Sequence, residues 1–186
     1  SYLKQRLGAY DARELAVGSP FDYRSSTLLY FPTNMPEPSA LFYQQTASRI
    51  IEEITQALKG RTLVLFTSYS HLRATTEQVG ESLANAGITV LAQGSSGSRA
   101  QLLERFREEE SAVLFGTRSF WEGIDVVGPA LSCVIITRIP FAVPSDPIFA
   151  ARAETFDDPF TEYSVPDAVL RFRQGFGRLI RSKSDR

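Results

Sequence analysis

The chain of 186 residues is long enough to form one domain with its own hydrophobic core. Its composition is 43% hydrophobic and 22% charged, and its net charge of −1 gives no general affinity for polyanions. The single cysteine, Cys133, excludes an internal disulfide and a four-cysteine metal or iron–sulfur site within these residues. Without a secretory signal or an apolar run that could cross a bilayer, the sequence predicts a cytoplasmic protein with no membrane partner.

The first third of the chain contains few regular elements. Glycines and a Ser-Pro pair interrupt residues 1–27, which predicts a short helix followed by a loop. Residues 27–31 have the composition of a strand, and the prolines that follow mark an extended connection. Apolar residues recur at helical spacing over about 39–58, and Gly60 is a suitable stop for this helix.

The remainder alternates between strand and helix patterns. Continuous apolar runs, typical of parallel strands buried on both faces, occupy 62–66, 88–91, 112–115 and 133–136. Helices are expected between and after them, over 72–86, from a capping box at Ser98 and Gln101 through Phe106, and over 148–155 and 166–181. This order predicts one α/β domain over 1–186, with a parallel sheet covered by helices on both faces and ligands at the carboxyl ends of its strands.

A basic segment near the C-terminus has the spacing Gln-x-x-Gly-Arg-x-Ile-Arg over 174–181. If this segment is helical, Arg178 and Arg181 share one face, and Gln174 lies one turn before Arg178. Two adjacent guanidinium groups favour an anion between them, and arginine binds phosphate through a fork of hydrogen bonds. A solvated basic helix end would explain the arginines alone, but it explains the complete spacing less well.

A second segment, Gly116–Asp125, begins where the strand over 112–115 ends. Phe120 and Trp121 could offer a face on which a base stacks, and two neighbouring hydroxyls, of Thr117 and Ser119, could donate to phosphate oxygens. Asp125 could orient an arginine or a ribose hydroxyl. Core packing of Trp121, with Asp125 at the start of a turn, is an equally good interpretation.

Other strand ends give weaker signals. The hydroxyl-rich segment 67–70 follows a strand, and Ser70 is a better candidate than Ser68 for capping the next helix. The polar segment 93–98 lies along a sugar-phosphate backbone or is simply a surface loop. No P-loop, dinucleotide fingerprint, nucleophile elbow or metal-ligand spacing occurs, so the chain has arginines for a phosphate but nothing to hold a nucleotide and magnesium.

These motifs together resemble the DinG/XPD family of superfamily two DNA helicases, in its bacterial DinG branch. The segment 174–181 resembles motif VI and Gly116–Asp125 resembles motif V. Weaker likenesses follow the family order along nearly the whole chain: Ser19–Tyr23 to the opening segment, Leu63–Tyr69 to motif IV, Gln93-Gly94 to the motif after it, and Arg138–Phe141 with Pro144–Pro147 to the connector between motifs V and VI.

The resemblance implies the RecA-like second motor domain of a 5′-to-3′ DNA helicase that is driven by ATP hydrolysis. ATP and Mg²⁺ would be held mainly by the first motor domain, which usually also carries an iron–sulfur cluster and is not in this chain. Both ends look cut, so we expect a fragment of a longer helicase that is inactive by itself. The partners implied are single-stranded DNA and the first motor domain.

The resemblance also implies roles for individual residues. Arg178 and Arg181 would act as arginine fingers, Gln174 would sense the nucleotide, and Glu122, Gly123 and Asp125 would tie motif V to the nucleotide site. Single-stranded DNA would contact Thr67, Ser68, Tyr69, Gln93, Gly94, Thr117, Phe120 and Trp121. A non-enzymatic module that binds nucleic acid or a protein remains the alternative, whereas a small-molecule enzyme is disfavoured because no catalytic dyad or cofactor loop occurs.

Overall fold

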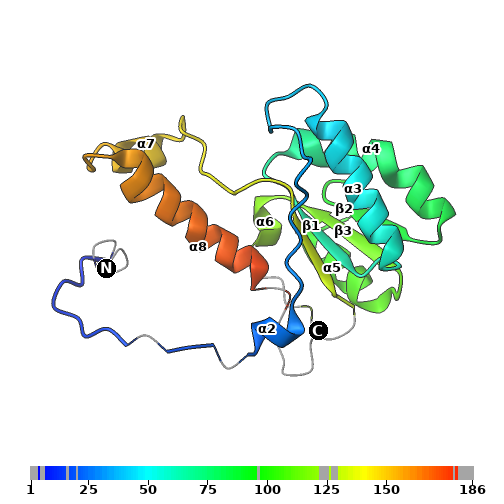
Figure 1. Ribbon diagram of the computed structural model, residues 1–186, viewed down its shortest axis with the longest axis horizontal. Helices are drawn as coiled ribbons and strands as arrows, with labels where there is room; N and C mark the ends of the chain where they lie inside the picture. Colours follow the sequence, from blue (N-terminus) through cyan, green and yellow to red (C-terminus); the bar gives the residue numbers. More distant parts are fainter. Residues whose placement is uncertain are drawn as a thin grey trace.

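A single parallel sheet lies at the centre of the computed structural model, which describes residues 4, 7–15, 17–19, 21–95, 97–121, 126, 130–177 and 179. The sheet has the strand order β2-β3-β1-β4 (Figure 1), with strands β1 (Thr62–Leu65), β2 (Thr89–Ala92), β3 (Ala112–Gly116) and β4 (Cys133–Ile136). Every pairing is parallel. The predicted parallel α/β class is therefore confirmed, and four of the five predicted strands form within one residue of their expected ends.

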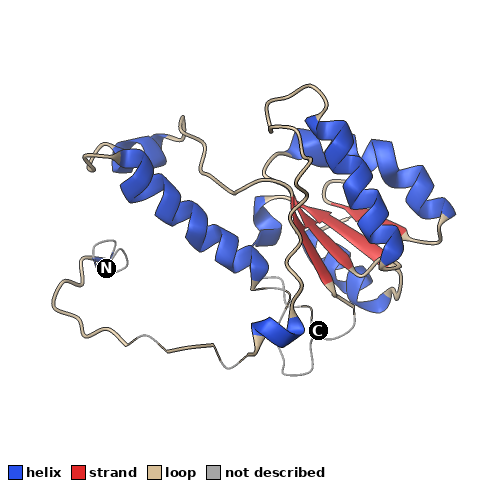
Figure 2. Ribbon diagram, in the orientation of Figure 1, coloured by secondary structure: helices blue, strands red, loops and turns tan. Residues whose placement is uncertain are grey.

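Helices cover both faces of this sheet. Helices α3 (Tyr43–Ala57) and α4 (Tyr69–Asn85) cover one face, and α5 (Arg99–Glu108) and α6 (Arg118–Trp121) cover the other (Figures 1 and 2). Successive side chains of a strand point to opposite faces, so Leu63 and Leu65 pack with α5 and α6, while Val64 and Phe66 pack with α3 and α4. This double burial explains the continuous apolar runs in the sequence.

The predicted N-terminal cap is confirmed for α5 but is wrong for α4. The predicted capping box of α5 is confirmed, because the Ser98 hydroxyl accepts from the Gln101 amide and the Gln101 side chain accepts from the Ser98 amide. The N-cap of α4 is Ser68 rather than the expected Ser70: its hydroxyl accepts from the His71 amide, and its backbone is extended as an N-cap requires.

The last helices form an arm that extends from the sheet. Helix α7 (Pro147–Ala153), a π-helical turn η1 (Phe160–Ser164) and the start of α8 (Val165–Phe176) lie at its distal end, and α8 runs back to the sheet (Figure 1). The Tyr163 ring stacks with Phe149 at 4.7 Å and with Phe156 at 5.4 Å between centroids, which holds the distal end together.

Helix α8 ends earlier than the sequence predicts. It stops at Phe176, Gly177 caps it, and the Leu179 amide bonds to the Phe176 carbonyl in a turn. Two glycines within three residues, Gly175 and Gly177, lower helix propensity here, so the expectation of a helix through Arg181 is wrong at its described end.

The segment before α3 is a loop and not the predicted strand over 27–31 (Figure 2). Its residues pair with none of the four strands, and Leu28 is 91% exposed. A strand-like composition therefore does not produce a strand where no neighbouring strand forms hydrogen bonds with the backbone. A short helix, α2 (Tyr23–Ser26), precedes the loop and packs Tyr23 against Phe176 at 5.8 Å between ring centroids. Helix α3 then begins at Tyr43, four residues later than the expected start near 39.

The connection from α3 to β1 has an unusual backbone. Lys59, Gly60 and Arg61 have φ values of 54°, 83° and 49°, which places three successive residues in the left-handed region. A Cβ on Gly60 would lie 2.6 Å from the amide nitrogen of Ala112. Only glycine therefore allows β1 and β3 to start side by side at this turn.

We expect Gly60→Ala to lower the free energy of unfolding by about 2–5 kcal/mol, because it combines left-handed strain with a clash against backbone that cannot move aside. Gly87→Ala is the matched control: its φ is 75°, but nothing lies within 4 Å of the added Cβ. The control should cost only about 1–2 kcal/mol. Urea unfolding midpoints at constant m-value measure both changes. Equal losses in the two variants would refute the packing argument.

Candidate functional site

The polar residues that follow the strands meet at one edge of the sheet. Leu65 lies opposite Gly116 and Ile136, so the residues after β1, β3 and β4 leave the sheet at the same level. Neighbouring strands are about 4.8 Å apart. The predicted DNA-contacting residues Thr67 and Thr117 are thus brought together, as the parallel-sheet argument requires.

Gln93 and Thr117 are joined directly. The Gln93 Oε1 atom accepts one hydrogen bond from the Thr117 amide and another from its hydroxyl, both at 2.8 Å. This bond pair ties the end of β2 to the end of β3. Because the side-chain oxygen is committed to Thr117, only the Nε2 hydrogens of Gln93 can serve a ligand.

Tyr69 and Gly94 also lie together at this edge. Gly94 has a φ of 90°, and a Cβ there would lie 1.8 Å from the Tyr69 hydroxyl oxygen. The tyrosine is 50% exposed, so its hydroxyl rests over the glycine backbone while much of its surface faces solvent. Thr67 is exposed, whereas the Ser68 hydroxyl is used to cap α4 and to bond Ser70 at 2.6 Å.

The two aromatic residues of the motif V segment do not form a stacking platform. Phe120 is 0% and Trp121 is 5% exposed. The Phe120 side chain packs over Gly116, where a Cβ would lie 2.5 Å from it, and Trp121 Nε1 donates to the Phe66 carbonyl at 3.3 Å. The expectation that these rings contact DNA is therefore wrong, and the core-packing interpretation of Trp121 is correct. Aromatic composition alone could not distinguish the two.

The Trp121 indole also seats the end of α8. A Cβ on Gly175 would lie 2.9 Å from Trp121 Cε3 and 3.1 Å from a methyl group of Leu65. The absence of a side chain therefore allows the last turn of α8 to rest against the end of β1. Gln174, in the same turn, is exposed. Gln174, the predicted nucleotide-sensing residue, is thus held next to the carboxyl end of β1 by its neighbour Gly175.

Five of the predicted site residues lie outside the described part of the chain: Glu122, Gly123, Asp125, Arg178 and Arg181. Their expected nucleotide contacts stay predictions. Within the described residues, no group of three histidine, cysteine or carboxylate side chains is arranged to hold a metal ion. No helix among these residues is both long and apolar enough to span a bilayer.

Sequence reasoning missed one cation at the same edge. Arg138 follows β4, its guanidinium lies over the Tyr43 ring at 4.6 Å from the centroid, and its Nη2 donates to the Pro38 carbonyl at 2.6 Å. The signal for Arg138 in the sequence is its position just after a parallel strand, although the motif around it resembles only a connector.

Comparison with known proteins agrees with this geometry. Residues 51–186 match the family model described as Helicase C-terminal domain. The chain belongs to this helicase family. Its parallel sheet with helices on both faces is accordingly the RecA-like α/β fold that the sequence predicts for such a domain.

Named relatives place the chain among DinG-like helicase domains. It is 40% identical over 186 residues to the ATP-dependent DNA helicase YoaA of Haemophilus influenzae, covering 98% of this chain and 28% of that protein. It is 38% identical to the 3′-5′ exonuclease DinG of Bacillus subtilis, over 100% of this chain and 21% of that protein. The ATP-dependent helicase DinG of Mycobacterium tuberculosis H37Rv is 41% identical, over 94% of this chain and 26% of that protein. The chain thus spans about a quarter of the length of these relatives.

The fit between α8 and Trp121 can be tested with Gly175→Ala. The added methyl group should push the indole from its place, lower the free energy of unfolding by about 1–3 kcal/mol and change the fluorescence of the only tryptophan. Gly80→Ala, inside α4 with nothing within 4 Å of the new Cβ, is the control. The control should gain about 0.5–1 kcal/mol with an unchanged emission spectrum. An unchanged emission spectrum in Gly175→Ala would contradict the tight contact between Gly175 and the Trp121 indole.

Proposed function

We propose that residues 1–186 form the second motor domain of a longer, DinG-like, ATP-dependent DNA helicase. The observation that carries this proposal is the seating of the last turn of α8 at the carboxyl end of β1, where Gly175 meets Trp121 and Leu65. It places the start of the Gln-x-x-Gly-Arg-x-Ile-Arg segment beside the strand ends that carry Thr67 and Thr117. Family membership and the names of the relatives support the same function.

In this proposal, ATP and Mg²⁺ are held by the first motor domain, because the chain has no P-loop. Arg178 and Arg181 donate to the γ-phosphate across the cleft, where they stabilise the charge of the transition state. Gln174 senses the nucleotide, and Glu122, Gly123 and Asp125 of the segment that resembles motif V tie that motif to the same site.

Single-stranded DNA lies along the carboxyl edge of the sheet. Exposed Thr67 and half-exposed Tyr69 face it, and Gln93 donates through Nε2. Gly94 has no side chain and so leaves room for the Tyr69 hydroxyl at this surface. Thr117 is held in place by Gln93. Closure on ATP and opening after hydrolysis move the domain along the strand, with the 5′-to-3′ direction of the helicases that the sequence resembles.

The finger assignment predicts separate effects on catalysis and on DNA binding. In the full-length protein, Arg178→Ala and Arg181→Ala should each lower DNA-stimulated ATP hydrolysis by about 10³-fold or more, since the transition-state charge loses its donor. Affinity for single-stranded DNA should stay nearly unchanged. Steady-state phosphate release and fluorescence anisotropy with a labelled oligonucleotide measure the two properties.

Arg49→Ala is the control, because this arginine is exposed on α3 and paired with Glu53, one turn away. It should leave both measurements unchanged. Normal hydrolysis in both finger variants would remove the catalytic assignment. A full-length protein that binds DNA but does not hydrolyse ATP with Mg²⁺ present would favour the non-enzymatic binding module instead.

A further inference from the structure

Arg138 leaves the sheet directly beside the proposed DNA surface. Ile136 of β4 lies opposite Leu65 of β1, and the next residue, Thr137, donates its amide and its hydroxyl to the Leu65 carbonyl, both at 3.2 Å. The parallel register therefore continues past the strand ends. Arg138 is placed at the level of Thr67, one strand away, at a spacing of about 4.8 Å.

The guanidinium of Arg138 is held in a fixed position. One face rests on the Tyr43 ring, and Nη2 donates to the Pro38 carbonyl. The Tyr43 hydroxyl in turn donates to the carbonyl of Thr137, so the ring is anchored to the residue just before Arg138. A planar cation stacked on an aromatic ring keeps its hydrogen-bonding edge oriented and loses little freedom when it binds an anion.

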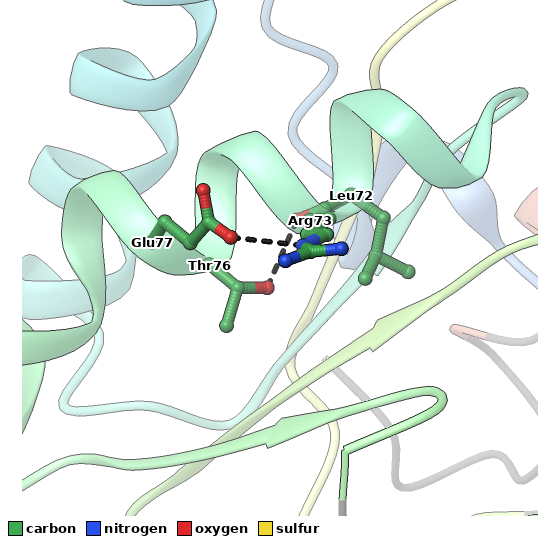
Figure 3. A network of polar contacts seen from close by, with 4 residues as sticks. All are labelled: Leu72, Arg73, Thr76 and Glu77. Atoms are coloured by element: carbon green, nitrogen blue, oxygen red, sulfur yellow. Dashed lines mark hydrogen bonds and ion pairs between the residues drawn. The ribbon is translucent and has the colours of Figure 1, made fainter.

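No anion in the described part of the chain balances this charge. The four arginine–carboxylate ion pairs found among the described residues involve Arg49, Arg73, Arg105 and Arg171. Arg138 Nε is buried and has no hydrogen-bond partner there. Arg73, on α4, shows the contrasting arrangement: its Nε donates to the Glu77 carboxylate at 2.9 Å (Figure 3).

The charge of Arg138 also acts on a neighbouring histidine. His71 lies in the first turn of α4, and its pKa is lowered below the ordinary value, first by burial and then by the charge of Arg138. No carboxylate offsets these two effects. Arg138 therefore lies near the first turn of α4, a 17-residue helix, and the amino-terminal end of a helix favours anions.

We propose that Arg138 binds a backbone phosphate of single-stranded DNA and extends the DNA surface from β1 across to β4. A phosphate fits the hydrogen-bonding fork of arginine, and Arg138 follows the next strand after those of Gln93, Thr117 and Thr67 in the order β2-β3-β1-β4. The inference rests on the proposed function, because it adds a contact to the same DNA surface. A carboxylate from elsewhere in the longer protein is the competing occupant.

The salt dependence of DNA binding distinguishes these occupants. The full-length protein would be titrated into a labelled oligothymidine at several salt concentrations, without nucleotide. Removal of one phosphate contact makes the slope of log K against log salt concentration shallower by about 0.7 for a single strand. We expect this change for Arg138→Gln, with weaker binding at low salt. Arg73→Gln, which alters an arginine already paired with Glu77, should keep the unaltered slope.

Arg138→Lys provides a second variant if Arg138→Gln fails to fold. It keeps the charge but not the planar fork, so the slope should stay the same while Kd rises several-fold. An unaltered Kd in Arg138→Lys, or an unaltered slope in a folded Arg138→Gln, would overturn the inference alone and favour the carboxylate. Absence of oligothymidine binding by the unaltered protein would overturn the proposed function as well.

Discussion

The double burial of β1 is the constraint on which the rest of the domain depends. This strand lies between β3 and β4, and its four residues are fully buried. Alternate side chains enter the two hydrophobic clusters on opposite faces, so one short strand joins both layers of helices. Its ends are equally constrained: the left-handed turn at Gly60 fixes where β1 begins, and the Phe66 carbonyl just after β1 receives the Trp121 indole.

Around that strand end, structural and functional residues are interleaved. Trp121 and Gly175 are buried. Thr67 follows Phe66, whose carbonyl accepts from the Trp121 indole, and Gln174 precedes Gly175, yet both Thr67 and Gln174 are exposed. The segment that resembles motif V therefore places two of its side chains, Phe120 and Trp121, in the core. A substitution at Trp121 would alter the proposed nucleotide and DNA surfaces together, although the indole touches neither.

The sequence predicted the parts of the fold whose stability comes from local pattern. Largely apolar runs identified the four strands of the sheet, because burial on both faces leaves few polar positions in them. The capping box at Ser98 was likewise readable, since both of its hydrogen bonds join residues three apart. The polar strand ends could be located as well, because parallel strands present their carboxyl ends at one edge.

The features that the sequence did not predict depend on distant contacts. Residues 27–31 have strand composition but pair with no strand of the sheet. Trp121 packs against Gly175, which is 54 positions away in the sequence. Nothing near Arg138 in the sequence indicates that Tyr43 lies beneath its guanidinium. In each case the deciding neighbour comes from another element, which composition and spacing do not reveal. Local sequence signals also failed at the N-cap of α4, where Ser68 rather than Ser70 has the extended backbone that an N-cap requires.

The arm formed by α7, η1 and α8 has a mechanical consequence. Helix α8 has 12 residues and is therefore about 18 Å long. At one end it packs against the sheet through a contact too tight for a methyl group. At the other end it continues from η1, which stacked aromatic rings join to α7. A tilt of about 10° around the seated end would carry the distal end through about 3 Å. A small displacement of the packed end of α8 at the strand ends would thus produce a larger displacement of α7 and η1 at its distal end.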